Sequence, residues 1–209
     1  MPRAARSFAP PRICFITGTP DDGAPLETIV LQLLVAGIRF VQYREKSRTK
    51  RELFYEALRL RELTRRFNAC LVINDYADIA LAVDADGVHL GQDDLPLHEA
   101  RKIMGSRLIG ISTHSLEEAR SAEQGGADYV GFGSIFPTTT KEVVTLQGVE
   151  ALRQVKHALH IPVIAIGGIK ADTVQTVFEA GCDSAAVSSG LLRGNIEENA
   201  RRFLSAAGG

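Results

Sequence analysis

Short, continuously apolar runs alternate with longer amphipathic stretches along most of this chain. The apolar runs are rich in β-branched residues and do not alternate with polar ones, which is typical of parallel strands covered on both faces. They predict eight strands: "RICFIT" (12–17), "RFVQYR" (39–44), "CLVIN" (70–74), "GVHL" (87–90), "LIGIS" (108–112), "YVGFG" (129–133), "PVIAIG" (162–167) and "SAAVSS" (184–189).

The stretches between these runs have the periodicity of helices. Two clear examples are "LETIVLQLLVAG" (26–37) and "TKRELFYEALRLRELTRRF" (49–67). In the second, apolar residues recur at helical spacing from Leu53 to Leu63, while Arg and Glu occupy the other face. This pattern favours a solvated helix face over a nucleic-acid-binding patch.

One local phrase recurs where a predicted helix meets a predicted strand. Its copies are "VAGIRFV", "VDADGVHL", "QGGADYVGF" and "EAGCDSAAV". Each reads as a helix C-terminus, usually capped by Gly, followed directly by a strand. A repeated helix–turn–strand unit without long polar linkers predicts a single α/β domain, a (β/α)8 TIM barrel over residues 12–209. A flexible N-terminal arm is expected over 1–11, and an open doubly wound sheet is the structural alternative.

Composition narrows the classes of function. The 209 residues are 45% hydrophobic, enough for a substantial core, and the net charge of −1 excludes a global field that attracts nucleic acid or anionic membranes. No stretch approaches the ~20 apolar residues of a membrane span. The start, "MPRAARSFAPPR", lacks the apolar region of a secretory signal, so a cytoplasmic location is expected. The widely spaced Cys14, Cys70 and Cys182 are interpreted as buried small hydrophobes.

Polar side chains gather where the predicted strands stop. In a (β/α)8 barrel the C-terminal ends of all strands meet on one face, and active sites are built there. We therefore expect these residues to be neighbours: Gln42, Arg44, Lys46, Asn74, Asp75, Gln92, Asp93, Asp94, Ser112, Thr113, His114, Thr138, Thr140, Lys141, Gly167, Gly168, Ser188, Ser189 and Gly190.

The charges in this set predict a magnesium–diphosphate site. Arg44 offers a rigid fork for phosphate oxygens, and Lys46 and Lys141 act as mobile point charges. Asp75 and Asp94 are hard oxygen ligands, and Mg²⁺ typically takes one or two carboxylates with water and phosphate completing its shell. Asp93 is interpreted as a helix cap.

A second anion site is predicted after strands seven and eight. "IGGIKAD" removes side chains where the backbone turns, and "SSGLL" opens the next loop. These loops are the usual phosphate cradle of the barrel. Two tight turns without a ligand are the alternative. His89, in the middle of "GVHL", is expected to pack or to bond the backbone inside the barrel, and no Ser–His–Asp order or His–Cys cluster indicates a nucleophilic hydrolase.

Beyond residue chemistry, the chain resembles the thiamine phosphate synthase family. The resemblance rests on "QYREK", "INDYADIALAVDADGVHLGQDDLP", "IGISTHSLEEA", "GADYVGFGSIFPTTTK", "IPVIAIGGI" and "AVSSG". The family joins a hydroxymethylpyrimidine diphosphate to a thiazole phosphate and releases pyrophosphate. The resemblance implies a Mg²⁺-dependent transferase whose partners are these two small molecules, with no nucleic acid or membrane; the oligomeric state, a homodimer included, stays open.

The resemblance also assigns roles to residues of this chain. It implies that Asp75 and Asp94 hold Mg²⁺. The pyrimidine diphosphate would meet Gln42, Arg44, Lys46, Asn74, Ser112 and Lys141, and the thiazole phosphate would meet Thr138, Thr140, Gly168, Ser188 and Ser189. Tyr43, Glu45 and Thr139 lie within the same motifs and complete the expected substrate-binding set. The expected catalytic residues are Arg44, Lys46, Ser112 and Lys141.

The sequence departs from the family pattern at a few places. Tyr43 and Glu45 stand where Leu and Asp are usual, and Ser134 stands where proline is common. No proline follows Lys141, and Ser188 replaces an aliphatic residue. Two alternative functions therefore stay open: a thiazole tautomerase, which has no use for a diphosphate site, and a catalytically silent barrel that binds a phosphate metabolite. The full set of charged residues at the strand ends favours the synthase.

Overall fold

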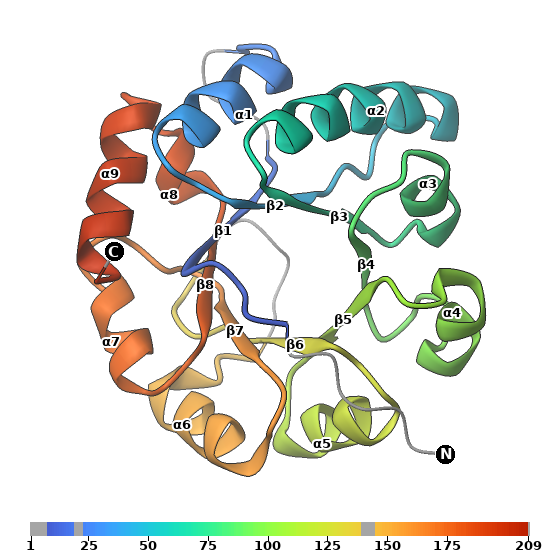
Figure 1. Ribbon diagram of the computed structural model, residues 1–209. Helices are drawn as coiled ribbons and strands as arrows, with labels where there is room; N and C mark the ends of the chain where they lie inside the picture. Colours follow the sequence, from blue (N-terminus) through green and yellow to red (C-terminus); the bar gives the residue numbers. More distant parts are fainter. Residues whose placement is uncertain (1–7, 19–22, 139–144, 209) are drawn as a thin grey trace.

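The eight predicted strands form one closed barrel. The computed structural model describes residues 8–18, 23–138 and 145–208, and within these the parallel strands pair in sequence order, with β1 closing on β8 (Figure 1). The strands are β1 (Ile13–Ile16), β2 (Phe40–Tyr43), β3 (Cys70–Asn74), β4 (Gly87–Leu90), β5 (Leu108–Thr113), β6 (Tyr129–Phe132), β7 (Val163–Ile166) and β8 (Ser184–Val187). The predicted TIM barrel is confirmed, and the open sheet is excluded.

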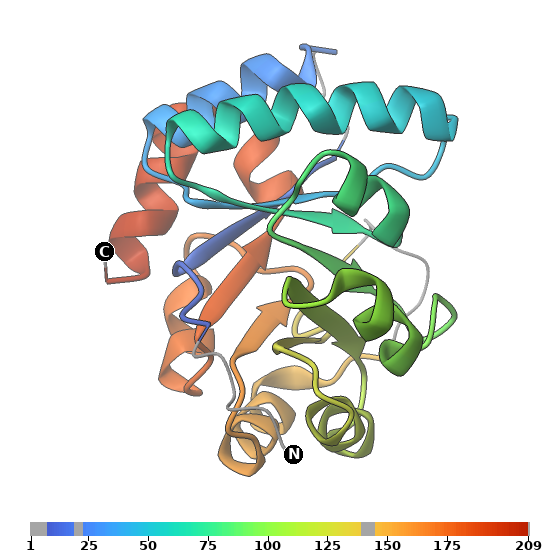
Figure 2. The same cartoon turned by 45° about the vertical axis from the view of Figure 1, so that its right-hand side comes forward.

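Helices surround the barrel on its outside (Figures 1 and 2). They are α1 (Leu26–Val35), α2 (Lys50–Arg66), α3 (Ala77–Ala82), α4 (Leu97–Met104), α5 (Leu116–Gln124), α6 (Gly148–Ala158), α7 (Val174–Glu179), α8 (Ser189–Leu192) and α9 (Ile196–Ala206). Helix α2 begins with a capping box, in which Thr49 and Glu52 satisfy each other's backbone N–H groups. None of the described helices is both long and apolar enough to cross a membrane.

Two apolar layers stabilise the barrel. The larger lies between the strands and the helices, and the smaller fills the lumen with Cys14, Ile16, Phe40, Val72, Tyr129, Ile164 and Ala186. Gly110 is needed for this filling, because a Cβ there would overlap the ring of Tyr129. The three cysteines are free, with Cys14 and Cys182 buried and Cys70 partly buried, in agreement with the sequence interpretation.

The N-terminal end of the lumen is covered by a residue from the expected arm. The Phe8 ring packs against Phe40 at a centroid distance of 5.8 Å and against Tyr129 at 5.6 Å. The Ser184 hydroxyl donates to the carbonyl of Pro11 at 2.7 Å. The segment expected to be a flexible arm over 1–11 is therefore packed on the barrel from Phe8 onward.

The recurring helix-to-strand phrase places an aspartate before three of the strands. Asp86, Asp128 and Asp183 immediately precede β4, β6 and β8. Each carboxylate accepts the backbone N–H of a residue on the preceding strand at 2.8 Å; the donors are Leu71, Ile109 and Val163. Each also accepts from a cation on a covering helix, namely Arg61 at 2.7 Å, Arg101 at 2.5 Å and Lys156 at 2.7 Å.

These aspartates set the register of three strand pairs. The backbone N–H of each aspartate donates to the carbonyl of the same residue that its carboxylate accepts from, at 2.8–2.9 Å. Two hydrogen bonds to one residue fix where the second strand of the pair starts. The copy of the phrase before β2 carries Arg39 in this place, whose guanidinium donates to the carbonyl of Leu34 at 2.6 Å instead.

We predict that Asp128→Ala destabilises the fold. The change leaves the partly buried Ile109 N–H without its acceptor, which costs about 1–3 kcal/mol. Urea unfolding measures the loss in the free energy of unfolding. Asp128→Asn keeps one acceptor oxygen and should lose less, and Glu62→Ala, on the exposed face of α2, serves as the surface control. An Asp128→Ala protein as stable as the control variant would contradict the assignment.

Candidate active site

The lumen just below the C-terminal ends of the strands is polar. Gln42, Asn74 and His89 are buried there, with at most 9% of each residue exposed. His89 Nδ1 lies 3.1 Å from the Tyr129 phenol oxygen, and its Nε2 lies 2.9 Å from the Ser112 hydroxyl. The Gln42 side chain hydrogen-bonds to the same phenol. The expected substrate contacts Gln42 and Ser112 are therefore linked through two side chains that carry no expected role.

This polar chain forms the floor of the site. A small cavity in the lumen borders this chain, and its lining includes Cys14 and Tyr129 as well as Gln42, His89 and Ser112. Burial raises the pKa of Tyr129, so its phenol stays protonated and can donate. The expectation for His89 was packing or a backbone bond; instead it bonds two side chains and holds the Ser112 hydroxyl at the rim.

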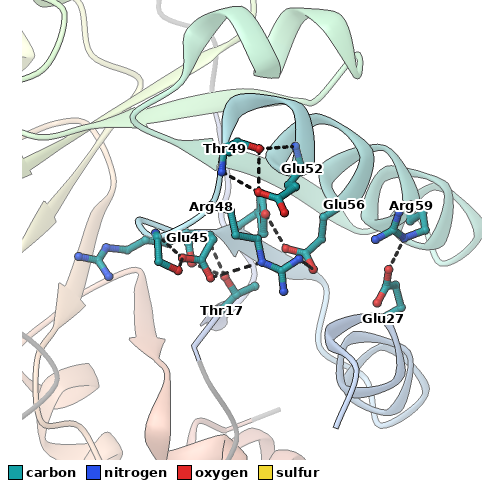
Figure 3. Close-up of polar contacts among 11 residues, drawn as sticks. Thr17, Glu27, Glu45, Arg48, Thr49, Glu52, Glu56 and Arg59 are labelled. Atoms are coloured by element: carbon teal, nitrogen blue, oxygen red, sulfur yellow. Dashed lines mark hydrogen bonds and ion pairs between the residues drawn. The ribbon is translucent and has the colours of Figure 1, made fainter. Parts of the chain in front are cut away.

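The segment that follows β2, residues 44–48, is called the tip here and is held by hydrogen bonds to its backbone. The Thr17 hydroxyl donates to the carbonyl of Arg44 at 2.9 Å and accepts from the Arg44 N–H at 2.8 Å (Figure 3). Thr17 is buried, at the end of β1. Further along the tip, Lys46 Nζ lies 3.3 Å from Asp75 Oδ2. The expected cation Lys46 is thus beside the expected metal ligand Asp75.

Two expected substrate contacts of this tip have other partners. The Tyr43 phenol donates to Glu56 Oε2 at 2.6 Å, outside the barrel and under α2. Burial and the Glu56 carboxylate raise the pKa of Tyr43. The Glu45 carboxylate accepts the N–H of Ser47 at 2.6 Å and its hydroxyl at 2.7 Å. The placement of the Tyr43 side chain among substrate contacts is therefore corrected, because alternation along β2 turns it away from the lumen.

The two carboxylates expected to bind metal lie against each other. Burial is the main cause that raises the pKa of Asp75, followed by its hydrogen bond and repulsion with Asp94, while Lys46 opposes the shift. Asp94 Oδ2 also accepts the N–H of Gly91 at 2.6 Å. Asp75 adopts φ +65°, an uncommon conformation that is found at functional sites more often than elsewhere. Two adjacent carboxylates, with Lys46 as the one cation that contacts Asp75 among the described residues, are suited to binding a divalent ion.

Asp93 does not have its expected role. Helix α4 begins at Leu97, and the residue at its N-cap is Pro96, with no side-chain cap. Asp93 lies exposed three residues earlier, in the turn between β4 and the helix. The neighbouring Gln92 instead reaches across to β5, where its amide donates to the carbonyl of Ser112 at 2.5 Å. The reading of Asp93 as a helix cap was wrong.

Turns from three strands meet at the expected second anion site. After β6 the chain keeps pairing with the end of β7, since Ile135 N–H donates to Ile166 at 2.9 Å and Phe136 N–H to Gly167 at 3.0 Å. A Cβ on Gly168 would lie 2.7 Å from the Phe136 carbonyl oxygen. Gly190, after β8, packs against the turn that contains Ile169, because its Cβ would lie 3.4 Å from that carbonyl.

This contact brings most of the expected thiazole phosphate set together. Thr138 and Gly168 belong to the turns after β6 and β7, and Ser189 begins helix α8 directly after β8. The Ser188 hydroxyl faces Gly18 instead, at a position 2.8 Å from where a Cβ of Gly18 would be. Thr139, Thr140 and Lys141 lie outside the described residues.

Three residues of the site were missed from the sequence. Thr17 ends the first strand, so the rule that polar strand tips gather at the mouth could have found it. Tyr129 begins its strand at the opposite end, and only the space opposite Gly110 lets its ring lie across the lumen. Glu56 stands in the middle of a charged helix.

We predict that Gly168→Ala disturbs the junction of these turns. At φ +63° an alanine is strained, and its Cβ meets the backbone after β6. The expected loss is about 2–4 kcal/mol in the free energy of unfolding, with faster hydrogen exchange at the Ile135 and Phe136 amides. Gly194→Ala is the matched control, since Gly194 has φ +72° and nothing within 4 Å of its Cβ position. Equal losses in the two variants would contradict a crowded junction.

Comparison with known proteins identifies the family. The family model described as thiamine monophosphate synthase matches residues 13–191. The thiamine-phosphate synthase of Halalkalibacterium halodurans is 47% identical over 186 residues, 87% of each chain, and that of Shouchella clausii is 41% identical over 201 residues, 95% of this chain and 96% of the other. Among solved structures, thiamine phosphate pyrophosphorylase from Pyrococcus furiosus is 37% identical with a TM-score of 0.87, covering 94% of this chain and 95% of that one. The chain described here belongs to the thiamine monophosphate synthase family.

Proposed function

We propose that this protein is a transferase that makes thiamine phosphate. It condenses 4-amino-2-methyl-5-(diphosphooxymethyl)pyrimidine with 4-methyl-5-(2-phosphooxyethyl)thiazole and releases pyrophosphate. The observation that carries the proposal is the pairing of two kinds of anion site at one barrel mouth. The Lys46–Asp75–Asp94 group suits a metal-bound diphosphate, and the adjoining turns around Gly168 suit a phosphate monoester.

The diphosphate side is built on β2 to β5. Arg44 and Lys46 supply the positive charge that a diphosphate requires, and the sequence adds Lys141. Gln42, Asn74 and the Ser112 hydroxyl, held by His89, supply hydrogen bonds to the pyrimidine. Mg²⁺ would be held by Asp75 and Asp94, and when bound it neutralises charge on the diphosphate. Support for the metal is the contact between these two carboxylates.

The phosphate of the thiazole belongs to the turns after β6, β7 and β8. Glycines let the turns after β6 and β7 pack closely against each other. Thr138 and Ser189 add hydroxyl donors for the anion.

The chemistry requires charge stabilisation more than proton transfer. The C–O bond between the methylene carbon and the diphosphate breaks, and its electron pair leaves with pyrophosphate. The lone pair of the thiazole nitrogen forms the new C–N bond, so no general base is needed. Arg44, Lys46 and Lys141 stabilise the departing charge, and single preorganised groups of this kind contribute roughly 3–4 kcal/mol. Because the aminopyrimidine is electron-rich, we place C–O cleavage ahead of C–N formation.

The alternative activities explain less of the site. A thiazole tautomerase has no use for the group formed by Lys46, Asp75 and Asp94. A silent binding protein has no need of a metal site made by the two carboxylates. We further propose that the protein works in the cytoplasm, as expected for a biosynthetic enzyme that acts on small phosphorylated substrates.

An assay with both substrates tests the function and the metal together. We predict that the protein forms thiamine phosphate only when Mg²⁺ is present. Asp75→Asn and Asp94→Asn should each raise the Mg²⁺ concentration for half-maximal activity by about tenfold or more, since each removes a charged ligand. Binding of the thiazole phosphate, measured by calorimetry, should stay within about twofold of wild type. Product formation that is indifferent to Mg²⁺, or unchanged activation in both variants, would overturn the metal site.

A second pair of variants separates the two anion sites. Arg44→Lys keeps the charge but loses the bidentate fork, so KM for the pyrimidine diphosphate should rise by about tenfold. Ser189→Ala should instead raise KM for the thiazole phosphate by about threefold to tenfold, the effect of one lost hydrogen bond. Steady-state kinetics with each substrate varied in turn gives both constants. If both variants shift the same substrate, the division of the mouth is wrong.

A further inference from the structure

A buried carboxylate on α2 joins the two ends of the tip after β2. Glu56 is 3% exposed. Its Oε2 accepts the phenol of Tyr43 at 2.6 Å, and its Oε1 lies 2.9 Å from Arg48 Nη1. Tyr43 is the last residue of β2, and Arg48 directly precedes Thr49, the N-cap of α2. Figure 3 shows Arg48 between Glu45 and Glu56, with the start of α2 beside it.

The segment enclosed by this link carries the cations of the diphosphate side. Arg44 and Lys46 both lie between Tyr43 and Arg48. Their path is further restricted from within the tip, where Glu45 binds the N–H and hydroxyl of Ser47 and lies 4.0 Å from Arg48 Nε. Thr17 holds the backbone of Arg44 from the other side. By binding Tyr43 and Arg48, Glu56 fixes both ends of the segment that carries Arg44 and Lys46. The positions of these two cations decide how an anion is bound.

Helix α2 has stabilising contacts that do not involve this carboxylate. The helix start has its own capping box of Thr49 and Glu52, and the helix is tied to α1 by the Glu27–Arg59 ion pair (Figure 3). Burying a charge is costly even when it is paired, and a well-packed apolar side chain is often as stable or more so. A buried carboxylate is therefore weak evidence for a role in stability. With one oxygen on Tyr43 and the other on Arg48, it is placed to fix the geometry of both partners.

We propose that Glu56 is a positioning residue, which holds the segment from Arg44 to Lys46 in the geometry that binds the diphosphate. This inference rests on the proposed function for its substrate, although pyrophosphate binding tests it independently. A displacement of about 1 Å in a binding group can cost as much as 100-fold in rate. Contacts of Glu56 outside the mouth are therefore enough to affect how Arg44 and Lys46 bind the diphosphate.

The central experiment compares Glu56→Gln with Glu27→Gln. Glu56→Gln keeps an acceptor for Tyr43 but removes the charge that holds Arg48, and it should raise KM for the pyrimidine diphosphate about tenfold. KM for the thiazole phosphate should stay within about twofold. The dissociation constant for inorganic pyrophosphate with Mg²⁺, measured by calorimetry, should rise by a similar factor of about ten. Glu27→Gln breaks the ion pair of the same helix with Arg59, and its remaining link to the tip is an electrostatic attraction to Arg48. It should therefore change each of the three constants by less than about twofold.

Two further variants keep the proposal testable if Glu56→Gln does not fold. Tyr43→Phe and Arg48→Gln each remove one partner of the carboxylate and should raise KM for the diphosphate by about threefold to tenfold. The double variant Arg48→Gln/Glu56→Gln should be no worse than the more impaired single variant, because both changes break the same link. A merely structural role predicts instead that both substrates are affected equally, in proportion to the loss of thermal stability.

The outcomes separate this proposal from the proposed function. If wild type binds pyrophosphate and Glu56→Gln weakens that binding, Glu56 is a positioning residue even when no thiamine phosphate is formed. If wild type forms thiamine phosphate and Glu56→Gln leaves the diphosphate constants unchanged, the function stands and the proposal falls. Wild-type protein that neither binds pyrophosphate nor forms thiamine phosphate would overturn both.

Discussion

Closure of the sheet between β1 and β8 is the constraint on which the site depends. Pairing of Phe15 with Val187 turns a sequence of eight parallel strands into a ring, so that polar residues far apart in the chain share one rim. The closure places the end of β1 beside the end of β8, where Gly18 leaves room for the Ser188 hydroxyl. The neighbouring pair of β1 with β2 places Thr17 next to the tip after β2. Without the ring, the two anion sites would not face a common space.

The lumen has an apolar part at the N-terminal end of the strands and a polar part toward their C-terminal ends. Phe8, Phe40 and Tyr129 pack at the N-terminal end of the strands. The Tyr129 phenol marks the boundary, since its ring belongs to the apolar layer and its oxygen bonds His89. From there hydrogen bonds continue to Ser112 at the rim. The hydrogen-bonded chain from Tyr129 through His89 thus links the packing of the core to the orientation of the Ser112 hydroxyl at the mouth.

Much of the fold and part of the site could be predicted from the sequence. The continuous apolar runs found all eight strands, and the rule for strand ends brought Lys46, Asp75 and Asp94 together correctly. The same rule failed for Tyr43, because it takes no account of which face of the strand a residue occupies. The roles expected for Thr139, Thr140 and Lys141 remain predictions, as these residues lie outside the described part of the chain.

Glu56 shows why the rest was harder to find. Its helix is rich in Arg and Glu, so one more glutamate reads as solvated surface. Yet Glu56 lies three residues after Leu53 and four before Leu60, on the face that α2 buries. A charge on an apolar helix face requires a partner, but only the three-dimensional structure identifies that partner as Tyr43 and Arg48.

The aspartates before β4, β6 and β8 have a consequence for how this protein can change over evolution. They anchor the strands at the end of the barrel away from the mouth, and each acts within its own strand pair. Substitutions at these three places can therefore change the stability of the barrel one strand pair at a time. The loops at the opposite end can vary under separate selection. Because stability and catalysis depend on opposite ends of the barrel, descendants of this protein can adapt to a new temperature without a change in the reaction. They can also acquire new substrates without a change in the strands.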